Sequence, residues 1–89
     1  MAVERWTVRE HRQVARWLLR RPNYAPVYGR ARNLLAEDPY RGEPLRGRCR
    51  GLWKLRVGEL RLVYEVRRGE RVVYVWRVGL RENIYEGLC

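Results

Sequence analysis

The sequence of 89 residues has no serine and no phenylalanine, and it contains one threonine, one histidine and one aspartate. A Ser-His-Asp triad needs a serine, and a ribonuclease that works with two histidines needs a second imidazole. Both kinds of catalytic site are therefore excluded for this chain. A catalyst built from these residues has to use Arg, Lys, Tyr, Glu or Cys side chains.

Cysteine and long apolar runs are also scarce. Cys49 and Cys89 lie 40 residues apart, form no CxxC motif and are accompanied by a single imidazole, so we expect no metal site and no cofactor. No apolar run approaches the roughly 18 residues of a membrane-spanning helix, and "MAVERWTVRE" acquires charges too early for a signal peptide. We therefore expect a cytoplasmic protein without membrane contact, whose thiols stay reduced.

Positive charge is what the sequence has in excess. The formal net charge is +10, and 19 of the 20 basic residues are arginines, with Lys54 as the single lysine. Arginine presents a planar fork of donors that matches phosphate oxygens two at a time. GC-rich coding or heat adaptation would explain the choice of Arg over Lys equally well, but neither explains the surplus of positive charge. Nucleic acid is therefore the first candidate partner.

A strand followed by two helices is predicted for the first 38 residues. The opening "AVERWTV" is β-branched and aromatic, as strands are. Thr7 and Glu10 have the spacing of a capping box, so the first helix should begin there. The second helix should have Asn23 as its cap, carry Pro26 in its first turn and stop at Asp38. Two helices joined by so few residues should form an antiparallel hairpin.

The second half of the chain changes to the two-residue period of strands. Residues 39–51 contain three glycines and two prolines and are predicted as a basic loop. Residues 52–66 alternate around a turn at Gly58, which predicts a β-hairpin, and residues 71–79 predict a third strand. Residues 1–89 should therefore form one α+β domain with a four-stranded sheet: a strand, the helix hairpin, a three-stranded antiparallel meander and a short C-terminal tail.

The two faces of this sheet should differ in character. The face under the helices should take the apolar set Trp53, Leu55, Leu62, Tyr64, Tyr74 and Trp76. The open face should present Lys54, Arg56, Arg61 and Arg77 around Val63, Val73 and Val75. A charged outer face can simply keep a protein soluble, but these basic residues cluster without acidic partners. The pattern therefore favours an anionic ligand.

Four motifs occur in a recognisable order: "LRG" at 45–47, "WKLRVG" at 53–58, "RLVY" at 61–64 and "VGLRENIY" at 78–85. Together with the order of elements they resemble the RelE/ParE superfamily of toxins from bacterial and archaeal toxin–antitoxin modules. The resemblance covers nearly the whole chain. It implies a single RelE-like toxin domain, related in fold to the microbial ribonucleases.

The resemblance also implies a function. RelE-type members are metal-independent endoribonucleases that enter the ribosomal A site, where they contact 16S rRNA, cut mRNA and so inhibit translation. Each is held inactive by a cognate antitoxin, here expected to be RelB-like. The RelE pattern implicates Lys54, Arg56, Arg61, Arg81 and Tyr85. We assign catalysis to Lys54, Arg61, Arg81 and Tyr85, and RNA binding to Arg56, Arg77, Arg46, Arg48 and Arg50.

These residue types suit the chemistry. Cleavage of RNA through its own 2′-hydroxyl needs a base, positive charge on the phosphorane-like transition state, and help for the departing 5′-oxygen. Lys54, crowded by Arg56 and Arg61, is the one basic side chain that like-charge repulsion could bring to the neutral form of a base. Arg81 is best assigned to the leaving group, and Tyr85 to base stacking or to orientation through its hydroxyl.

Each candidate has a structural alternative. Lys54 and Arg81 would be ordinary surface residues, Arg61 the ion-pair partner of Glu65 or Glu59, and Tyr85 a cap on the core. His11 is the obvious rival base, but it belongs to the start of the first helix, far in sequence from the basic strands.

Two other functions compete with the ribonuclease. A ParE-like toxin would inhibit DNA gyrase without cutting RNA, although the tail "RENIY" and the basic pair around Leu55 favour RelE. A basic RNA-binding domain without activity has only charge in its support, because the chain has neither the Phe-rich pattern of an RRM nor a KH-type GxxG.

Overall fold

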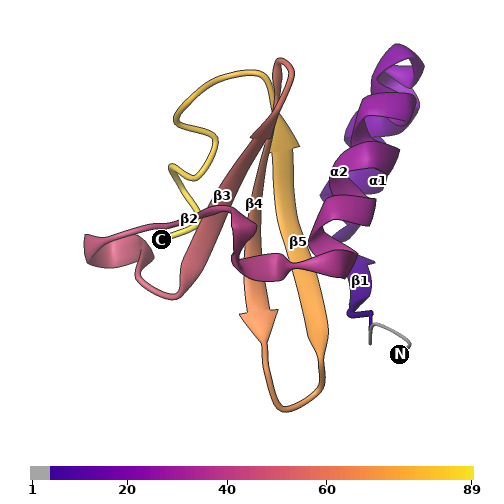
Figure 1. The fold of residues 1–89 in the computed structure, drawn as a ribbon. Helices are drawn as coiled ribbons and strands as arrows, with labels where there is room; N and C mark the ends of the chain where they lie inside the picture. Colours follow the sequence, from indigo (N-terminus) through magenta and orange to yellow (C-terminus); the bar gives the residue numbers. More distant parts are fainter. Residues whose placement is uncertain (1–4) are drawn as a thin grey trace.

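The computed structural model describes residues 5–89 as a mixed sheet with a pair of helices (Figure 1). Its elements, in chain order, are β1 (Thr7–Glu10), α1 (Arg12–Arg20), α2 (Ala25–Glu37), β2 (Glu43–Pro44), β3 (Leu52–Val57), β4 (Leu60–Arg67) and β5 (Val72–Gly79). Three short 3-10 helices lie between them, η1 (Pro22–Tyr24), η2 (Pro39–Arg41) and η3 (Gly47–Cys49). No helix in this part of the chain is long and apolar enough to cross a bilayer.

The sheet has five strands in the order β1-β5-β4-β3-β2, with β1 parallel to β5 and all other neighbours antiparallel. The predicted order of a strand, two helices and an antiparallel meander is confirmed, but the prediction of four strands is wrong. The additional strand, β2, lies in the stretch predicted as loop and pairs Glu43 with Lys54 and Pro44 with Trp53. A strand of two residues is too short to show alternation in the sequence. Its proline is tolerated because β2 is at the edge of the sheet.

The first helix begins later than predicted. Thr7 and Glu10, predicted as a capping box, lie in β1 and pair with β5. The cap of α1 is His11, whose Nδ1 accepts a hydrogen bond of 3.1 Å from the backbone N–H of Gln13. Pairing with a neighbouring strand satisfies several backbone groups at once, so it outweighs a local cap. Residues 2–4 of the predicted first strand lie outside the described residues.

The second helix follows the prediction at its end but not at its start. Asn23, the predicted cap, lies in η1, and Tyr24 is the residue that precedes the helix. Pro26 is in the first turn, and the helix stops before Asp38, whose side chain accepts a hydrogen bond of 3.0 Å from the N–H of Tyr40. Because η1 reverses the chain, α1 and α2 run in opposite directions, as predicted (Figure 1).

The hairpin between β3 and β4 is confirmed. Val57 pairs with Leu60 across a two-residue turn, and Gly58 has a φ of +60°. This left-handed conformation suits a residue without Cβ, which explains glycine at the turn. The turn fixes the register of the two strands that carry Lys54 and Arg61.

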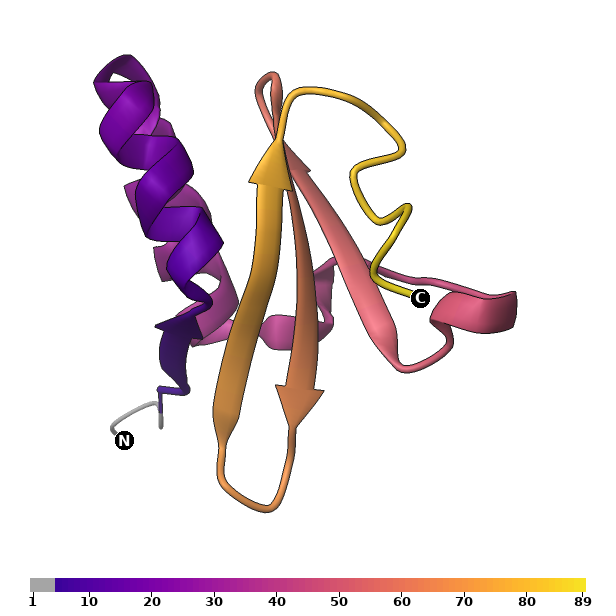
Figure 2. The ribbon, with the colours of Figure 1, turned by 180° about the vertical axis from the view of Figure 1, so that it is seen from behind.

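The hydrophobic core lies between the helix pair and one face of the sheet. Figures 1 and 2 show the helices on one side of β4 and β5 and the C-terminal segment on the other. The buried side chains of the core are Val8 from β1, Val14 from α1, Tyr28, Ala31, Leu35 and Ala36 from α2, Leu60, Leu62 and Tyr64 from β4, and Val73, Val75 and Val78 from β5. Trp53 and Leu55 of β3 pack against this set, as predicted.

A bulge changes the predicted faces of β5. Leu62 pairs with Val78 but Tyr64 pairs with Val75, so two steps on β4 correspond to three on β5. The extra residue is Trp76, and beyond it the alternation of β5 is shifted by one position. Tyr74 and Trp76 therefore do not belong to the helix-facing set, and Val73 and Val75 lie in the core instead of on the open face. Strict alternation cannot reveal such an insertion.

A polar network fastens α2 to β1. The carboxylate of Glu10 accepts hydrogen bonds of 2.8 Å from both the Tyr28 hydroxyl and Arg32 Nε, and Arg32 Nη2 donates to the carbonyl of Val8 at 2.7 Å. Burial, followed by the hydrogen bond to Glu10, raises the pKa of Tyr28. The glutamate predicted as a helix cap thus joins a strand to the second helix.

A buried tyrosine joins the sheet to the chain that follows α2. The Tyr64 side chain is fully buried, its hydroxyl donates a hydrogen bond of 2.7 Å to the carbonyl of Pro39, and burial raises its pKa. Gly42 leaves room for this hydroxyl, because a Cβ at position 42 would overlap both the Tyr64 hydroxyl and the backbone carbonyl of Lys54. The close approach places β2 beside Lys54.

We predict that Tyr64→Phe lowers the free energy of unfolding by about 1–2 kcal/mol, because the buried carbonyl of Pro39 loses its donor. Urea unfolding measures the change. Tyr40→Phe is the matched control, since the Tyr40 hydroxyl accepts from Arg68 at the surface, and its effect should stay within about 0.5 kcal/mol. Equal losses in the two variants would contradict this role of Tyr64.

Candidate functional site

A cleft of about 430 Å³ opens on the sheet face opposite the helices. Its walls come from β2, β3 and β4 and from the C-terminal segment, residues 80–89, which we call the tail. The polar and aromatic residues that line it are Arg41, Glu43, Lys54, Arg56, Arg61, Glu82 and Tyr85. Lys54, Arg61 and Tyr85, three of the four predicted catalytic residues, are therefore brought together, and so is the predicted RNA-binding residue Arg56.

Strand alternation accounts for the basic side chains of the cleft. In β3, Trp53 and Leu55 pack towards the core, so Lys54 and Arg56, which alternate with them, point to the open face. The register places Arg56 directly opposite Arg61. Like charges in that position destabilise a sheet unless each has another partner.

Each of the two arginines does have another partner. Arg56 Nε donates a hydrogen bond of 2.9 Å to the carbonyl of Gly58. Arg61 Nη1 donates at 2.6 Å to the carbonyl of Leu80, and its Nη2 lies 3.8 Å from the carboxylate of Glu82. The Arg61 side chain is only 19% exposed, so the tail fixes its position before any ligand arrives.

Two carboxylates at the cleft correct the expectation of a basic cluster without acidic partners. Glu43 Oε2 lies 3.7 Å from Lys54 Nζ, because β2 pairs these two residues across the sheet. Glu82 lies beside Arg61 from the tail. No sequence pattern indicates either neighbour, because Glu43 depends on an unpredicted strand and Glu82 on how the tail folds back.

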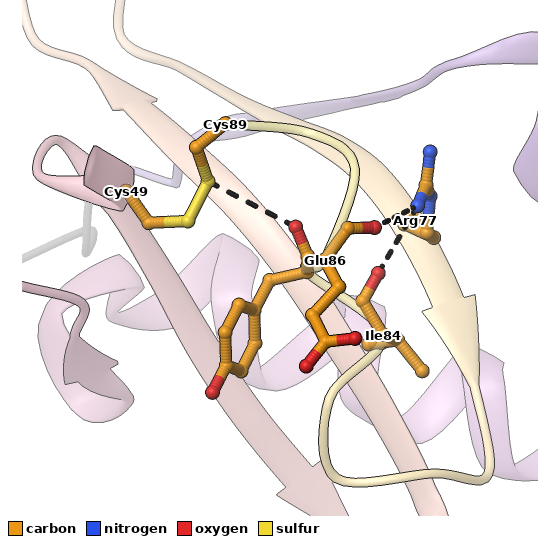
Figure 3. Close-up of a disulfide and its surroundings, with 6 residues drawn as sticks. Cys49, Arg77, Ile84, Glu86 and Cys89 are labelled. Atoms are coloured by element: carbon orange, nitrogen blue, oxygen red, sulfur yellow. Dashed lines mark hydrogen bonds between the residues drawn. A yellow bond between two sulfur atoms is a disulfide. The ribbon is translucent and has the colours of Figure 1, made fainter.

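Arg77 has a structural role that sequence reasoning missed. Its Nη1 donates hydrogen bonds of 3.2 Å to the carbonyl of Ile84 and 3.0 Å to the carbonyl of Glu86 (Figure 3). It does not line the cleft. Arg77 was predicted to bind RNA, but in this structure it holds the tail.

The other predicted residues lie around the cleft. Arg81 is exposed and does not line it, although the next residue, Glu82, does. Arg46, Arg48 and Arg50 are exposed on or beside η3. His11, the rival base, caps α1 and is not part of the cleft. Within residues 5–89, no group of three His, Cys, Asp or Glu side chains is placed to hold a metal ion.

A disulfide bond joins Cys49 to Cys89, with the two Cα atoms 5.2 Å apart (Figure 3). The expectation that both thiols stay reduced is therefore wrong for this structure. The two cysteines are 40 residues apart in sequence, and they meet because the tail returns across the open face to η3. Nothing in their spacing predicts that return.

The comparisons with known proteins agree with this geometry. The model of the ParE toxin of type II toxin–antitoxin systems, parDE, matches residues 29–85, which is more than half of the chain. The chain belongs to the RelE/ParE superfamily of type II toxins. No curated protein sequence matches this toxin.

Two solved structures resemble the toxin over most of its length. The toxin–antitoxin complex RelBE2 from Mycobacterium tuberculosis is similar at 30% sequence identity and a TM-score of 0.78, over 90% of this chain and 95% of that chain. The archaeal RelE-RelB complex from Pyrococcus horikoshii OT3 is similar at 23% identity and a TM-score of 0.72, over 86% and 96%. At that identity the archaeal structure supports the fold alone.

We predict that Glu43→Gln and Glu82→Gln each tighten binding of single-stranded RNA severalfold, because each removes a negative charge from a cleft that would receive phosphate. Titration of a fluorescent oligonucleotide at about 0.1 M salt measures this. Glu37→Gln, at the exposed end of α2, is the matched control and should change affinity less. Equal changes in all three variants would mean that net charge alone decides affinity.

Proposed function

We propose that this toxin is a ribosome-dependent endoribonuclease, which cuts mRNA in the ribosomal A site by attack of the 2′-hydroxyl on the adjacent phosphate. The observation that carries the proposal is the cleft in which Lys54, Arg56, Arg61 and Tyr85 come together on the open face. The similarity to the toxin–antitoxin complex RelBE2 over 90% of the chain supports the RelE branch of the superfamily.

Lys54 is the proposed base. Its side chain is about half exposed, and its cross-strand neighbours are the apolar Val63 on β4 and Glu43 on β2, so a ribose would approach the amine from the open side of the cleft. Arg56 and Arg61 lie on the same face and would stabilise the charge that develops on the phosphate oxygens. Arg61 is already held by the tail, so little reorganisation is needed when the substrate binds.

Arg81 and Tyr85 complete the proposed site from the tail. Arg81 is exposed and precedes a residue of the cleft wall, so it remains our candidate at the departing 5′-oxygen. The half-buried Tyr85 ring lines the cleft and offers a surface on which an unpaired base can stack. No metal ion takes part in this scheme.

The proposed partners follow from the charge and from the relatives. The similar structure RelBE2 is a toxin–antitoxin complex, and we propose a cognate RelB-like antitoxin that covers or neutralises the basic face. Arg46, Arg48 and Arg50 extend the positive charge beyond the cleft and would contact 16S rRNA. A cytoplasmic location goes with a ribosomal target.

We predict that Lys54→Met and Arg81→Ala each slow the chemical step by about 10²-fold or more, because each interaction acts in the transition state. Arg61→Ala should weaken both binding and rate, since a phosphate contact serves the ground state as well. Single-turnover cleavage of mRNA in the A site measures the rates. Arg30→Met, an exposed arginine on α2, is the charge-matched control and should cut normally. Full activity in Lys54→Met would remove the proposed base.

The second candidate function is inhibition of DNA gyrase, and the match of the ParE toxin model favours it. A toxin of that kind would arrest supercoiling and leave mRNA intact. A gyrase supercoiling assay beside the cleavage assay separates the two functions. Arrest of gyrase by a protein that cuts no mRNA on the ribosome would overturn our proposal.

We predict that RNA affinity falls steeply with salt, because binding through backbone phosphates releases counterions. Neutralisation of about 4 to 6 phosphates gives a log–log slope of about −3 to −5. Filter binding of a single-stranded oligonucleotide between roughly 50 and 200 mM salt measures the slope. A flat response would show that the net charge of +10 does not act through phosphate contacts.

A further inference from the structure

Tyr85 is held in place from both sides. Arg77 Nη1 binds the carbonyls of Ile84 and Glu86, the residues immediately before and after it. Four residues further on, Cys89 is bonded to Cys49 of η3 (Figure 3). Both attachments connect the tail to parts of the protein outside it.

We propose that Arg77 and the Cys49–Cys89 disulfide act together as a redox-sensitive clamp that positions Tyr85 in the cleft. The proposal rests on the proposed function, because it assigns Tyr85 to binding of RNA. Arg77 and the disulfide are positioning elements and touch no substrate themselves. Tyr85 is the side chain through which they act.

The packing of the tail supports the clamp. Ile84 lies against Gly79 so closely that a Cβ at position 79 would come within 2.7 Å of Ile84 Cγ2. The tail also contains two local hydrogen bonds, from the N–H of Glu86 to the carbonyl of Asn83 and from the N–H of Leu88 to the carbonyl of Tyr85. These local bonds shape turns but do not fix where the turns lie on the sheet. Arg61 holds the start of the tail through Leu80, and the clamp holds its end on both sides of Tyr85.

The disulfide also contacts the backbone of Tyr85 itself. The sulfur of Cys89 lies 3.8 Å from the carbonyl oxygen of Tyr85 (Figure 3). Because a bonded sulfur carries no hydrogen, this is a packing contact and not a hydrogen bond. Cys89 is exposed and Cys49 partly so, which leaves the bond open to attack by a thiolate.

Opening of the clamp is a thiol–disulfide exchange with a dithiol reductant. One thiolate of the dithiol attacks a sulfur of the bond and forms a mixed disulfide, and the other cysteine leaves as a thiolate that takes up a proton. The second thiol of the dithiol then attacks the mixed disulfide, and the remaining cysteine of the protein leaves as a thiolate that takes up a proton. The dithiol is oxidised to its disulfide by two electrons, and Cys49 and Cys89 are reduced to two thiols. Of the two parts of the clamp, Arg77 then remains.

The test compares oxidised toxin with toxin reduced by dithiothreitol. Hydrogen exchange reports the amides of residues 83–88, and binding of RNA with a 2′-deoxy ribose at the cut site reports the cleft without cleavage. We expect faster exchange in the tail and about tenfold weaker binding after reduction, the range expected for loss of one base–aromatic stack. Cys89→Ala should behave as reduced toxin in either condition.

Two further variants test the positioning role. In Tyr85→Ala the affinity should no longer respond to reduction, because the residue through which the clamp acts is absent. Arg77→Met should speed exchange in the tail and weaken binding, and the conservative Arg77→Lys, made separately, should show smaller changes in both. Arg67→Met is the charge-matched control, since Arg67 contacts Glu65 and the ring of Tyr74, and it should leave tail exchange unchanged.

The outcomes separate the clamp from the proposed function. Equal tail exchange and equal binding in oxidised and reduced toxin would overturn the clamp, even in a protein that cuts mRNA. A response to reduction that persists in Tyr85→Ala would also overturn it. A response that depends on Tyr85 in a protein that cuts no mRNA would sustain the clamp and reject the ribonuclease.

Discussion

The pairing of β3 with β4 determines which side chains of this toxin are buried in the core and which line the cleft on the open face. The two-residue turn at Gly58 sets the register, so Leu55 lies opposite Leu62 in the core and Arg56 opposite Arg61 on the open face. A slip by one residue would exchange the two sets. The core and the cleft are therefore two consequences of one register, and neither can be altered without the other.

That register creates a repulsion which the rest of the fold has to offset. Arg56 and Arg61 are held apart by the carbonyls of Gly58 and Leu80, and Glu43 and Glu82 supply negative charge beside the cleft. Partly exposed pairs of this kind add little to stability. Their effect is to orient the cations, so that the basic side chains of the cleft are held in place.

The strong periodic patterns predicted most of the fold. The predictions failed where strand pairing outweighed a local cap and where a bulge interrupted the alternation of β5. Alternation and the glycine turn were enough for β3 and β4, and Asp38 was enough for the end of α2. Thr7 and Glu10 have the residue types of a helix cap, but they pair with residues of β5 that lie 65 positions later in the sequence. The bulge at Trp76 cannot be read from the sequence of β5, because both possible alternations, Tyr74 with Trp76 and Val73 with Val75, would place apolar residues in the core.

The candidate site was predictable to the extent that it lies on regular strands. Lys54, Arg56 and Arg61 follow from alternation, and Tyr85 from the resemblance of the tail to RelE-type toxins. Glu43, Glu82 and the role of Arg77 depend on how β2 and the tail fold back on the sheet, and that is a matter of long-range packing.

The disulfide has a consequence for the unfolded chain. Residues 49–89 form a closed covalent ring that contains β3, β4 and β5, while β1 and both helices lie outside it. Closing a loop of this length removes about 4 kcal/mol of chain entropy from the unfolded ensemble. The three central strands thus stay near one another even when the helices detach, and the sheet half can re-form without a distant search. In the oxidised chain, the disulfide itself keeps β3, β4 and β5 within one covalent loop, whether or not the protein is folded.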